Sequence, residues 1–194
     1  MISRTRLVLA VSLPPLLIAV VALTHPDHLT TESAHHWQVM HTVLLPLFPL
    51  LGLGPWLVAR AVTPPGAVVV GVLAYAYACF YTSLDVLAGI AGGAIKDAAA
   101  GGLGIIFPVA GDLGDIGSIA YIAATALGTG AALRVTGWLR GVPSAALTVI
   151  GSFIFWQEHV YRPWGVFSMV MLAAGWGWMA LMVTAEADRS RSPR

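Results

Sequence analysis

The feature that most constrains the fold is a series of apolar runs that a soluble domain of this size could not bury. Of the 194 residues, 58% are hydrophobic and only 10% are charged, and the mean hydropathy is +0.82. Several runs reach the roughly 20 residues that an α-helix needs to cross a bilayer. Unpaired backbone groups are costly in lipid, so these runs are expected to be helical, and they are too long for the alternating strands of a barrel. The sequence therefore predicts an all-α, polytopic membrane helix bundle.

We predict a single transmembrane helical domain over residues 1–194 that ends in a short basic cytoplasmic tail at 185–194. The six predicted spans are 7–23, 37–59, 67–90, 116–133, 144–160 and 164–184. Arg4 and Arg6 precede the first apolar run, and the small residues at 20–22 resemble a cleavage site. An alternative is therefore that the first run is a cleaved signal peptide, which would leave five transmembrane helices.

Prolines predict where the first two spans bend or break. Pro14-Pro15 lies in the middle of the first run and predicts a kink there. The second run is interrupted by Pro46, Pro49 and Pro55. Each of these prolines leaves a backbone carbonyl without its helical partner inside the membrane.

Glycines predict the least regular part of the chain, between the third and fourth spans. The Gly-rich stretch 89–104 and the apolar piece 105–110 are expected to form a long connection, as a re-entrant or interfacial segment. Within it, Gly89 and Gly93 stand four residues apart, which predicts a close contact between helices at that point.

The basic residues predict that both termini lie in the cytoplasm, because cytoplasmic loops of membrane proteins are enriched in Lys and Arg. With six alternating spans, eight of the ten basic residues fall on the cytoplasmic side: Arg4, Arg6, Arg60, Arg134, Arg140, Arg189, Arg191 and Arg194. Only Lys96 and Arg162 fall outside. The opposite orientation would invert this distribution.

Composition also bears on origin and partners. The chain is rich in Ala, Gly, Pro and Arg, with Lys96 as its single lysine and no asparagine, which is typical of high-GC coding. In this character the whole chain resembles small integral membrane proteins of actinobacteria, and the resemblance implies a multi-pass protein of the bacterial plasma membrane. Its expected partners are the lipid bilayer and either further copies of itself or another membrane subunit, joined through helices. The sequence has no stripe of basic residues of the kind that binds nucleic acid.

Polar residues that interrupt the apolar runs form the candidate site. In the predicted topology, acids and histidines of three spans reach one level near the outer surface. Nitrogen and oxygen ligands from several helices suit a transition metal such as zinc, iron or copper. Haem, held by His41 and His159 on facing helices, is the alternative cofactor. The candidate ligands are His36, His41, Asp85, Glu158 and His159.

Each candidate also has a simpler interpretation. Asp85 needs only a buried partner, such as His41 or a tyrosine hydroxyl, and Glu158 could pair with Arg162 one turn later. His36 could bond to water or headgroups at the interface. Two pairs outside the candidate set are expected to have simple roles. His25 and His28 are predicted to be solvated loop residues, and Asp112 and Asp115 are predicted to cap a helix or form a turn.

Three classes of function follow, and the sequence does not choose among them. The first is a metal-dependent membrane protein whose site opens outward, as an oxidoreductase, a lipid hydrolase, or a metal sensor or carrier. The second is a small proton-coupled transporter that uses Asp85, and the third is an assembly subunit without chemistry of its own. The single cysteine, Cys79, excludes an internal disulfide and a CxxC motif, and no phosphate-binding loop is present.

Overall fold

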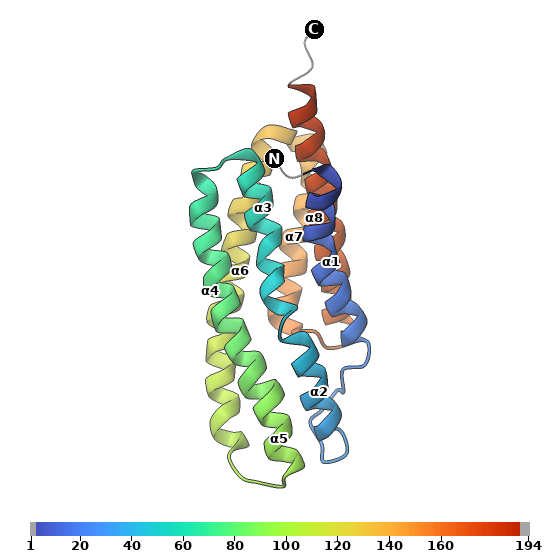
Figure 1. Ribbon diagram of the computed structural model, residues 1–194, viewed down its shortest axis with the longest axis vertical. Coiled ribbons are helices and arrows are strands. Elements are labelled where there is room, and N and C mark those ends of the chain that lie inside the picture. Colours follow the sequence, from blue (N-terminus) through green and yellow to red (C-terminus); the bar gives the residue numbers. More distant parts are fainter. Residues whose placement is uncertain (1–2, 191–194) are drawn as a thin grey trace.

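The computed structural model describes residues 3–190 as a set of long helices packed side by side (Figure 1). The elements are α1 (Arg4–Ala22), α2 (Ala34–Leu44), η1 (Phe48–Gly52), α3 (Leu53–Val62), α4 (Gly66–Leu84), η2 (Asp85–Ala91), α5 (Gly92–Asp97), α6 (Leu103–Thr136), α7 (Trp138–Glu158) and α8 (Trp164–Arg189). In this part of the chain six helical segments are long and apolar enough to cross a membrane, which confirms the all-α class and the predicted number of candidate spans. The second segment joins α2, η1 and α3, and the third joins α4, η2 and α5.

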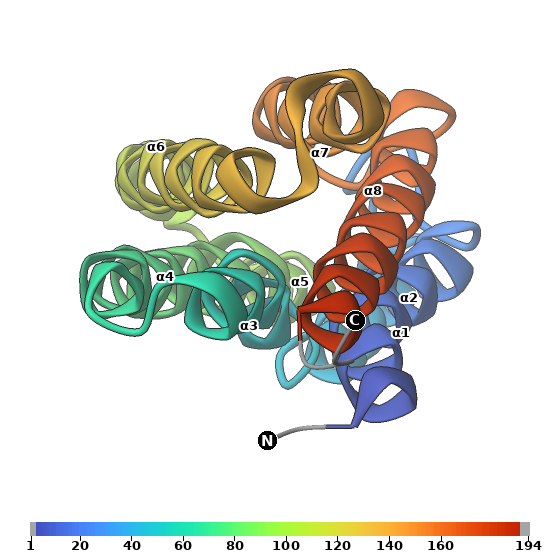
Figure 2. The same cartoon turned by 90° about the horizontal axis from the view of Figure 1, so that it is seen from above.

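The beginning of α1 and the end of α8 lie at one end of the molecule, which we call the proximal end, and the opposite end is the distal end (Figure 1). Seen along the helices in Figure 2, α3 and α4 lie next to each other and face α6. The last helix, α8, packs against both α7 and α1. Tyr77, Tyr121, Phe155 and Trp176 are almost fully buried and fill the space between these helices.

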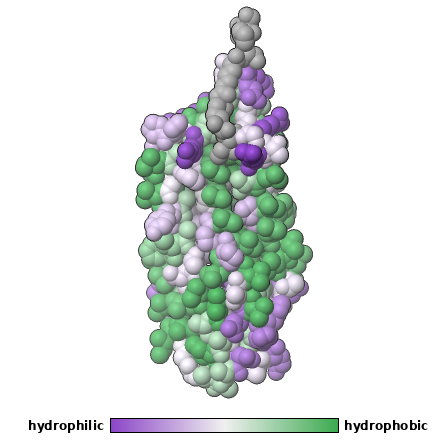
Figure 3. All heavy atoms as spheres, viewed as in Figure 1, coloured by the Kyte–Doolittle hydropathy of each residue, from purple (hydrophilic) through white to green (hydrophobic). Residues whose placement is uncertain are grey.

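The helices differ in length, and the difference falls at the distal end. At 1.5 Å per residue, the 19 residues of α1 and the 21 of α7 span about 28 and 31 Å, close to the thickness of the hydrocarbon core. The 34 residues of α6 span about 51 Å. In Figure 1 α5 and the start of α6 accordingly reach beyond the distal ends of α1, α7 and α8, with α2 beside them. On the face shown in Figure 3, strongly hydrophilic residues gather toward the two ends.

The predicted break in the second span is confirmed. The α-helix stops at Leu44, continues as the short 3₁₀ segment η1, and resumes as α3. One carbonyl in this break, that of Phe48, accepts a hydrogen bond of 3.0 Å from the buried Tyr77 hydroxyl. A side chain of a neighbouring helix therefore ties the broken part of this segment to α4.

The predicted close contact at Gly89 and Gly93 is also confirmed, and α2 is the partner. A Cβ on Gly93 would lie 2.8 Å from the Cβ of Gln38, and one on Gly89 would lie 2.3 Å from Cδ2 of His41. The indole of Trp37 donates a 3.1 Å hydrogen bond to the carbonyl of Ala88 in the same contact. Gly89 belongs to η2, a π-helical turn, and such turns occur frequently at functional sites.

The connection predicted over 89–104 and 105–110 is wrong. The third segment stays helical to Asp97, the turn is short, and 105–110 is the beginning of α6. Glycine and proline break helices less in a membrane than in water, because neighbouring helices re-satisfy the backbone. The predicted tail at 185–194 begins within α8, which continues to Arg189, and 191–194 lie outside the described residues.

Candidate metal centre

Three histidines from three different segments meet near the distal end. His25 lies three residues after α1, His41 lies on α2, and His159 directly follows α7. Their nearest ring nitrogens, one from each residue, all lie within 4.8 Å of one another. We call these three residues the histidine centre. It sits where α1 and α7 end, with α2 packed against it.

Hydrogen bonds fix the tautomers of two of the rings. Nδ1 of His25 lies 2.7 Å from the carbonyl oxygen of Pro26, and Nδ1 of His41 lies 2.7 Å from that of Trp37. A carbonyl can only accept, so both Nδ1 atoms carry the proton and donate. In the neutral ring the Nε2 lone pair is then free. A backbone carbonyl on Nδ1–H is also the arrangement that orients metal-binding histidines in proteins.

The third ring is held by a tyrosine. The Tyr81 hydroxyl on α4 is hydrogen-bonded to Nδ1 of His159, and when Nδ1–H donates to the hydroxyl oxygen the Nε2 lone pair of this ring is left for a ligand. The backbone of His159 has φ +50° and ψ −124°, in a region that side chains rarely adopt and that costs about 1–3 kcal/mol. This turn ends α7 and places the imidazole among Tyr81, Phe48 and Phe155.

Aromatic rings enclose the centre. The ring of His25 lies 5.3 Å from that of His41 and 5.9 Å from that of His159, centroid to centroid. Tyr161 and Trp37 cover His25 at 4.4 and 4.9 Å. This packing leaves His25 and His41 only 1% and 2% exposed, while His159 is half-buried.

Burial keeps the imidazole of His25 in the neutral form that can bind a cation. It lowers the pKa of this loop histidine, and the hydrogen bond to Pro26 opposes the shift only in part. His25 is therefore neutral at pH 7, the form that a metal requires. Its Nε2 is buried and has no hydrogen-bond partner among the described residues. An unpaired buried nitrogen is unfavourable, and a bound ion would satisfy it.

Asp85 is the second unsatisfied group in this region. Its side chain is fully buried, and neither carboxylate oxygen has a hydrogen-bond partner in the described part of the chain. Tyr81, which bonds His159, precedes it by one helical turn, and Gly89, which contacts His41, follows by about one turn. Because residues four apart share a helix face, Asp85 faces the same side as these two contacts. Its oxygens do not belong to the histidine centre itself.

The structure brings together some of the predicted ligands and separates others. His41 and His159 belong to the histidine centre, and Asp85 lies one turn from Tyr81 and from Gly89, which contact these two rings. His36 and Glu158 are exposed, and His36 Nε2 instead contacts the carbonyl of Thr24 at 2.8 Å. The alternative pairing of Glu158 with Arg162 is wrong, because Arg162 lies 3.6 Å from Asp27.

His25 is the residue that the sequence interpretation placed wrongly. It was expected to be solvated, and it is the most buried histidine of the described chain. The available signal was its position only three residues past an apolar run, where the chain must still turn over the ends of the neighbouring helices. Asp115, expected in a cap or turn, lies inside α6 and accepts a 2.9 Å hydrogen bond from Trp156.

Comparison with known proteins gives no match to a family model, to a curated protein or to a solved structure.

Proposed function

We propose that this chain is an integral membrane protein that binds one transition-metal ion through His25, His41 and His159. The observation that carries the proposal is the convergence of three ring nitrogens within 4.8 Å, with two rings fixed by carbonyls so that Nε2 is free. In all three rings Nδ1 has a protein partner. Histidines that served only to fill space would not need this arrangement.

The donor set favours zinc, copper or iron. Neutral imidazole suits these three metals, and three histidines with one open position form the ligand set of zinc sites that carry out chemistry. With Zn–N bonds of about 2.05 Å, tetrahedral ligands lie roughly 3.4 Å apart. Binding would thus draw the ring nitrogens together by up to about 1.4 Å. Haem fits less well, because Trp37, Tyr161 and Phe48 occupy the space around the rings that a porphyrin would need.

The distribution of charge supports an outward-facing centre. Arg4, Arg60, Arg134, Arg140 and Arg189 lie at the helix ends of the proximal side, whereas Lys96 and Arg162 lie distally. Because cytoplasmic sides of membrane proteins carry an excess of basic residues, this distribution supports a cytoplasmic proximal end. In a bacterial plasma membrane the histidine centre would then lie near the outer leaflet.

Asp85 has a role beside the ion in this proposal. Three neutral imidazoles leave the charge of a divalent ion uncompensated in a medium of low dielectric constant. The buried Asp85 on the adjoining helix face could ionise once an ion is bound, and as a carboxylate it would balance part of the charge of the ion. A buried acid within a membrane segment is by default a functional group.

Elemental analysis tests the proposal directly. The protein would be purified in mild detergent with a streptavidin-binding tag, and zinc, copper and iron would be measured per chain. We expect about one ion in the wild type and at least a tenfold loss in His25→Ala, His41→Ala and His159→Ala. His28→Ala and His35→Ala change exposed histidines of the same region and serve as matched controls that keep the ion. A wild-type protein that holds no metal and takes up no added zinc would overturn the proposal.

The buried, unpaired carboxylate also supports a second candidate, a small proton-coupled transporter that uses Asp85. Proton uptake by proteoliposomes under a pH gradient distinguishes the two. Transport predicts uptake that Asp85→Asn abolishes and that removal of metal by a chelator leaves unchanged. A metal protein without transport predicts no uptake above empty vesicles.

A further inference from the structure

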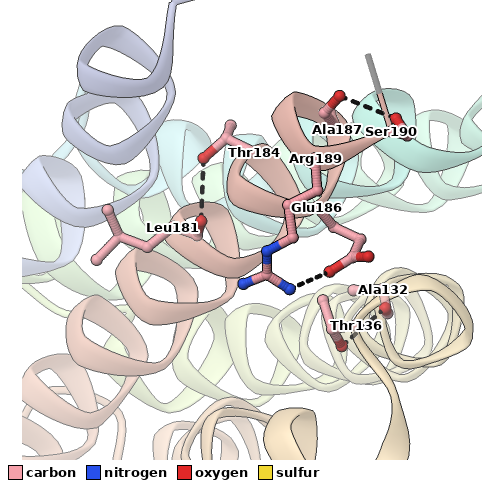
Figure 4. Close-up of polar contacts among 8 residues, drawn as sticks. All are labelled: Ala132, Thr136, Leu181, Thr184, Glu186, Ala187, Arg189 and Ser190. Atoms are coloured by element: carbon pink, nitrogen blue, oxygen red, sulfur yellow. Dashed lines mark hydrogen bonds and ion pairs between the residues drawn. The ribbon is translucent and has the colours of Figure 1, made fainter. Parts of the chain in front are cut away.

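A second polar site lies at the proximal end, far from the histidine centre. A cavity of about 260 Å³ opens there among α1, α6, α7 and α8. Its charged lining consists of Arg4, Arg140, Arg189 and Glu186. Figure 4 shows the α8 side of this cavity, with Thr136 of α6 close by.

The cavity carries an excess of positive charge. Glu186 lies 2.8 Å from Nη1 of Arg189, one turn away on the same helix, so this pair is internally balanced (Figure 4). Arg4 and Arg140 form no ion pair with any described residue. The Thr136 hydroxyl donates to the carbonyl of Ala132 at 3.0 Å and leaves the arginines as the groups that can bind an anion. Two guanidinium groups on different helices thus line one cavity without a counter-ion.

The cavity also has apolar lining, which is contributed by α8. Trp178 and Leu181 of α8 line it and are 44% and 37% exposed. At the beginning of α7, Trp138 and Leu139 are 70% and 92% exposed. Exposed apolar and aromatic residues at a helix end are typical of anchors at a membrane interface. An anion that binds here would therefore have an apolar surface directly beside its charged group.

We propose that this cavity binds the phosphate headgroup of an anionic phospholipid. Guanidinium groups match phosphate oxygens in geometry as well as charge, and basic pockets between transmembrane helices at the cytoplasmic side bind such headgroups. The exposed Trp178 and Leu181 lie where the acyl chains continue from the glycerol. A free phosphate ion would use the arginines but not this apolar wall.

Native mass spectrometry of the intact protein tests the proposal. The protein would be released from micelles that contain equal amounts of phosphatidylglycerol and phosphatidylcholine. We expect one retained phosphatidylglycerol per chain in the wild type. In the double variant Arg4→Gln/Arg140→Gln its affinity should fall about 30-fold, roughly fivefold for each arginine. The matched control is Arg60→Gln/Arg134→Gln, which removes the same charge from the same end outside the cavity and should retain the lipid.

Three results would overturn the proposal. Equal retention of the two lipids would show that the headgroup charge is not recognised. An equal loss in both double variants would show that the attraction comes from the general charge of this end. Displacement of phosphatidylglycerol by millimolar inorganic phosphate would show that the cavity takes free phosphate instead. Thermal unfolding of each variant in detergent establishes that it is folded before binding is compared.

Discussion

The candidate sites at the two ends of the molecule differ in how far their polar side chains are buried. In the histidine centre at the distal end, His25 and His41 are buried, and each of the three imidazoles is fixed by a hydrogen bond to Pro26, Trp37 or Tyr81. At the proximal end, Arg4, Arg140 and Arg189 are exposed around an open cavity. Buried neutral groups can be positioned for one ion, whereas exposed charges attract a class of anions. We therefore expect substitutions at the distal end to have the larger and more specific effects.

The largest expected effect comes from a methyl group at the contact between η2 and α2. In Gly89→Ala the new Cβ would lie 2.3 Å from Cδ2 of His41 and 2.6 Å from its Cβ, so the helix or the ring must move. We expect a loss of about 1–3 kcal/mol in the free energy of unfolding and a metal affinity at least tenfold lower. Thermal unfolding and zinc titration in detergent measure the two quantities.

The control for this change is Gly111→Ala on α6. An added Cβ there meets nothing within 4 Å, so the substitution should leave metal binding unchanged and stabilise the helix by about 0.5–1 kcal/mol. Similar behaviour of the two variants would contradict the close contact between Gly89 and His41.

A smaller effect is expected from the group that orients His159. Tyr81→Phe removes the hydroxyl bonded to Nδ1 of this ring and keeps the aromatic packing. Loss of such an outer partner typically lowers metal affinity 10–100-fold. Competition with a chelator of known zinc affinity measures the change. Tyr75→Phe alters a tyrosine that is 72% exposed and should bind zinc as the wild type does; an equal loss in both variants would argue against a specific role for Tyr81.

The fold was more predictable than the site. Six spans, the proline-induced break and the approach at Gly89 follow from local rules of length, proline chemistry and spacing. The distal extension of the third and fourth helices was missed because glycine-rich sequence indicates a loop in water, whereas packed helices tolerate it here. His41 and His159 were found because they interrupt or end apolar runs.

The remaining site residues depend on how loops fold back. Nothing in the spacing of the sequence shows that the turn after α1 carries His25 over the end of α7, or that it pairs Asp27 with Arg162. Those contacts arise from tertiary packing between segments more than 130 residues apart. Glu158 was misplaced for a related reason: the backbone turns at His159, so neighbours in sequence face different surroundings.

The pH dependence of the metal-free protein tests the burial of His25. Because burial lowers its pKa, the unfolded chain takes up a proton near pH 6.5 while the folded chain does not. Stability linked to His25 is therefore fully present above about pH 6.5 and is lost as the pH falls below it, by at most about 1.4 kcal/mol per pH unit. We expect wild type in chelator to show this additional slope relative to His25→Phe between pH 6.5 and 5. Parallel pH profiles would contradict the burial.

The smallest effect is expected from the ion pair that lies over the same loop. Asp27 and Arg162 are separated by 3.6 Å, and their side chains are 71% and 46% exposed, so water and salt screen the attraction. Asp27→Asn should change the free energy of unfolding by less than about 1 kcal/mol, and the change should shrink further at high ionic strength. Zinc affinity should stay within a factor of two, because the pair is not needed to fix any imidazole tautomer. Thermal unfolding at two salt concentrations and the same chelator competition provide the measurement. A loss of zinc as large as that of Tyr81→Phe would mean that the loop is held over His25 by charge and not by the aromatic contacts of Tyr161 and Trp37.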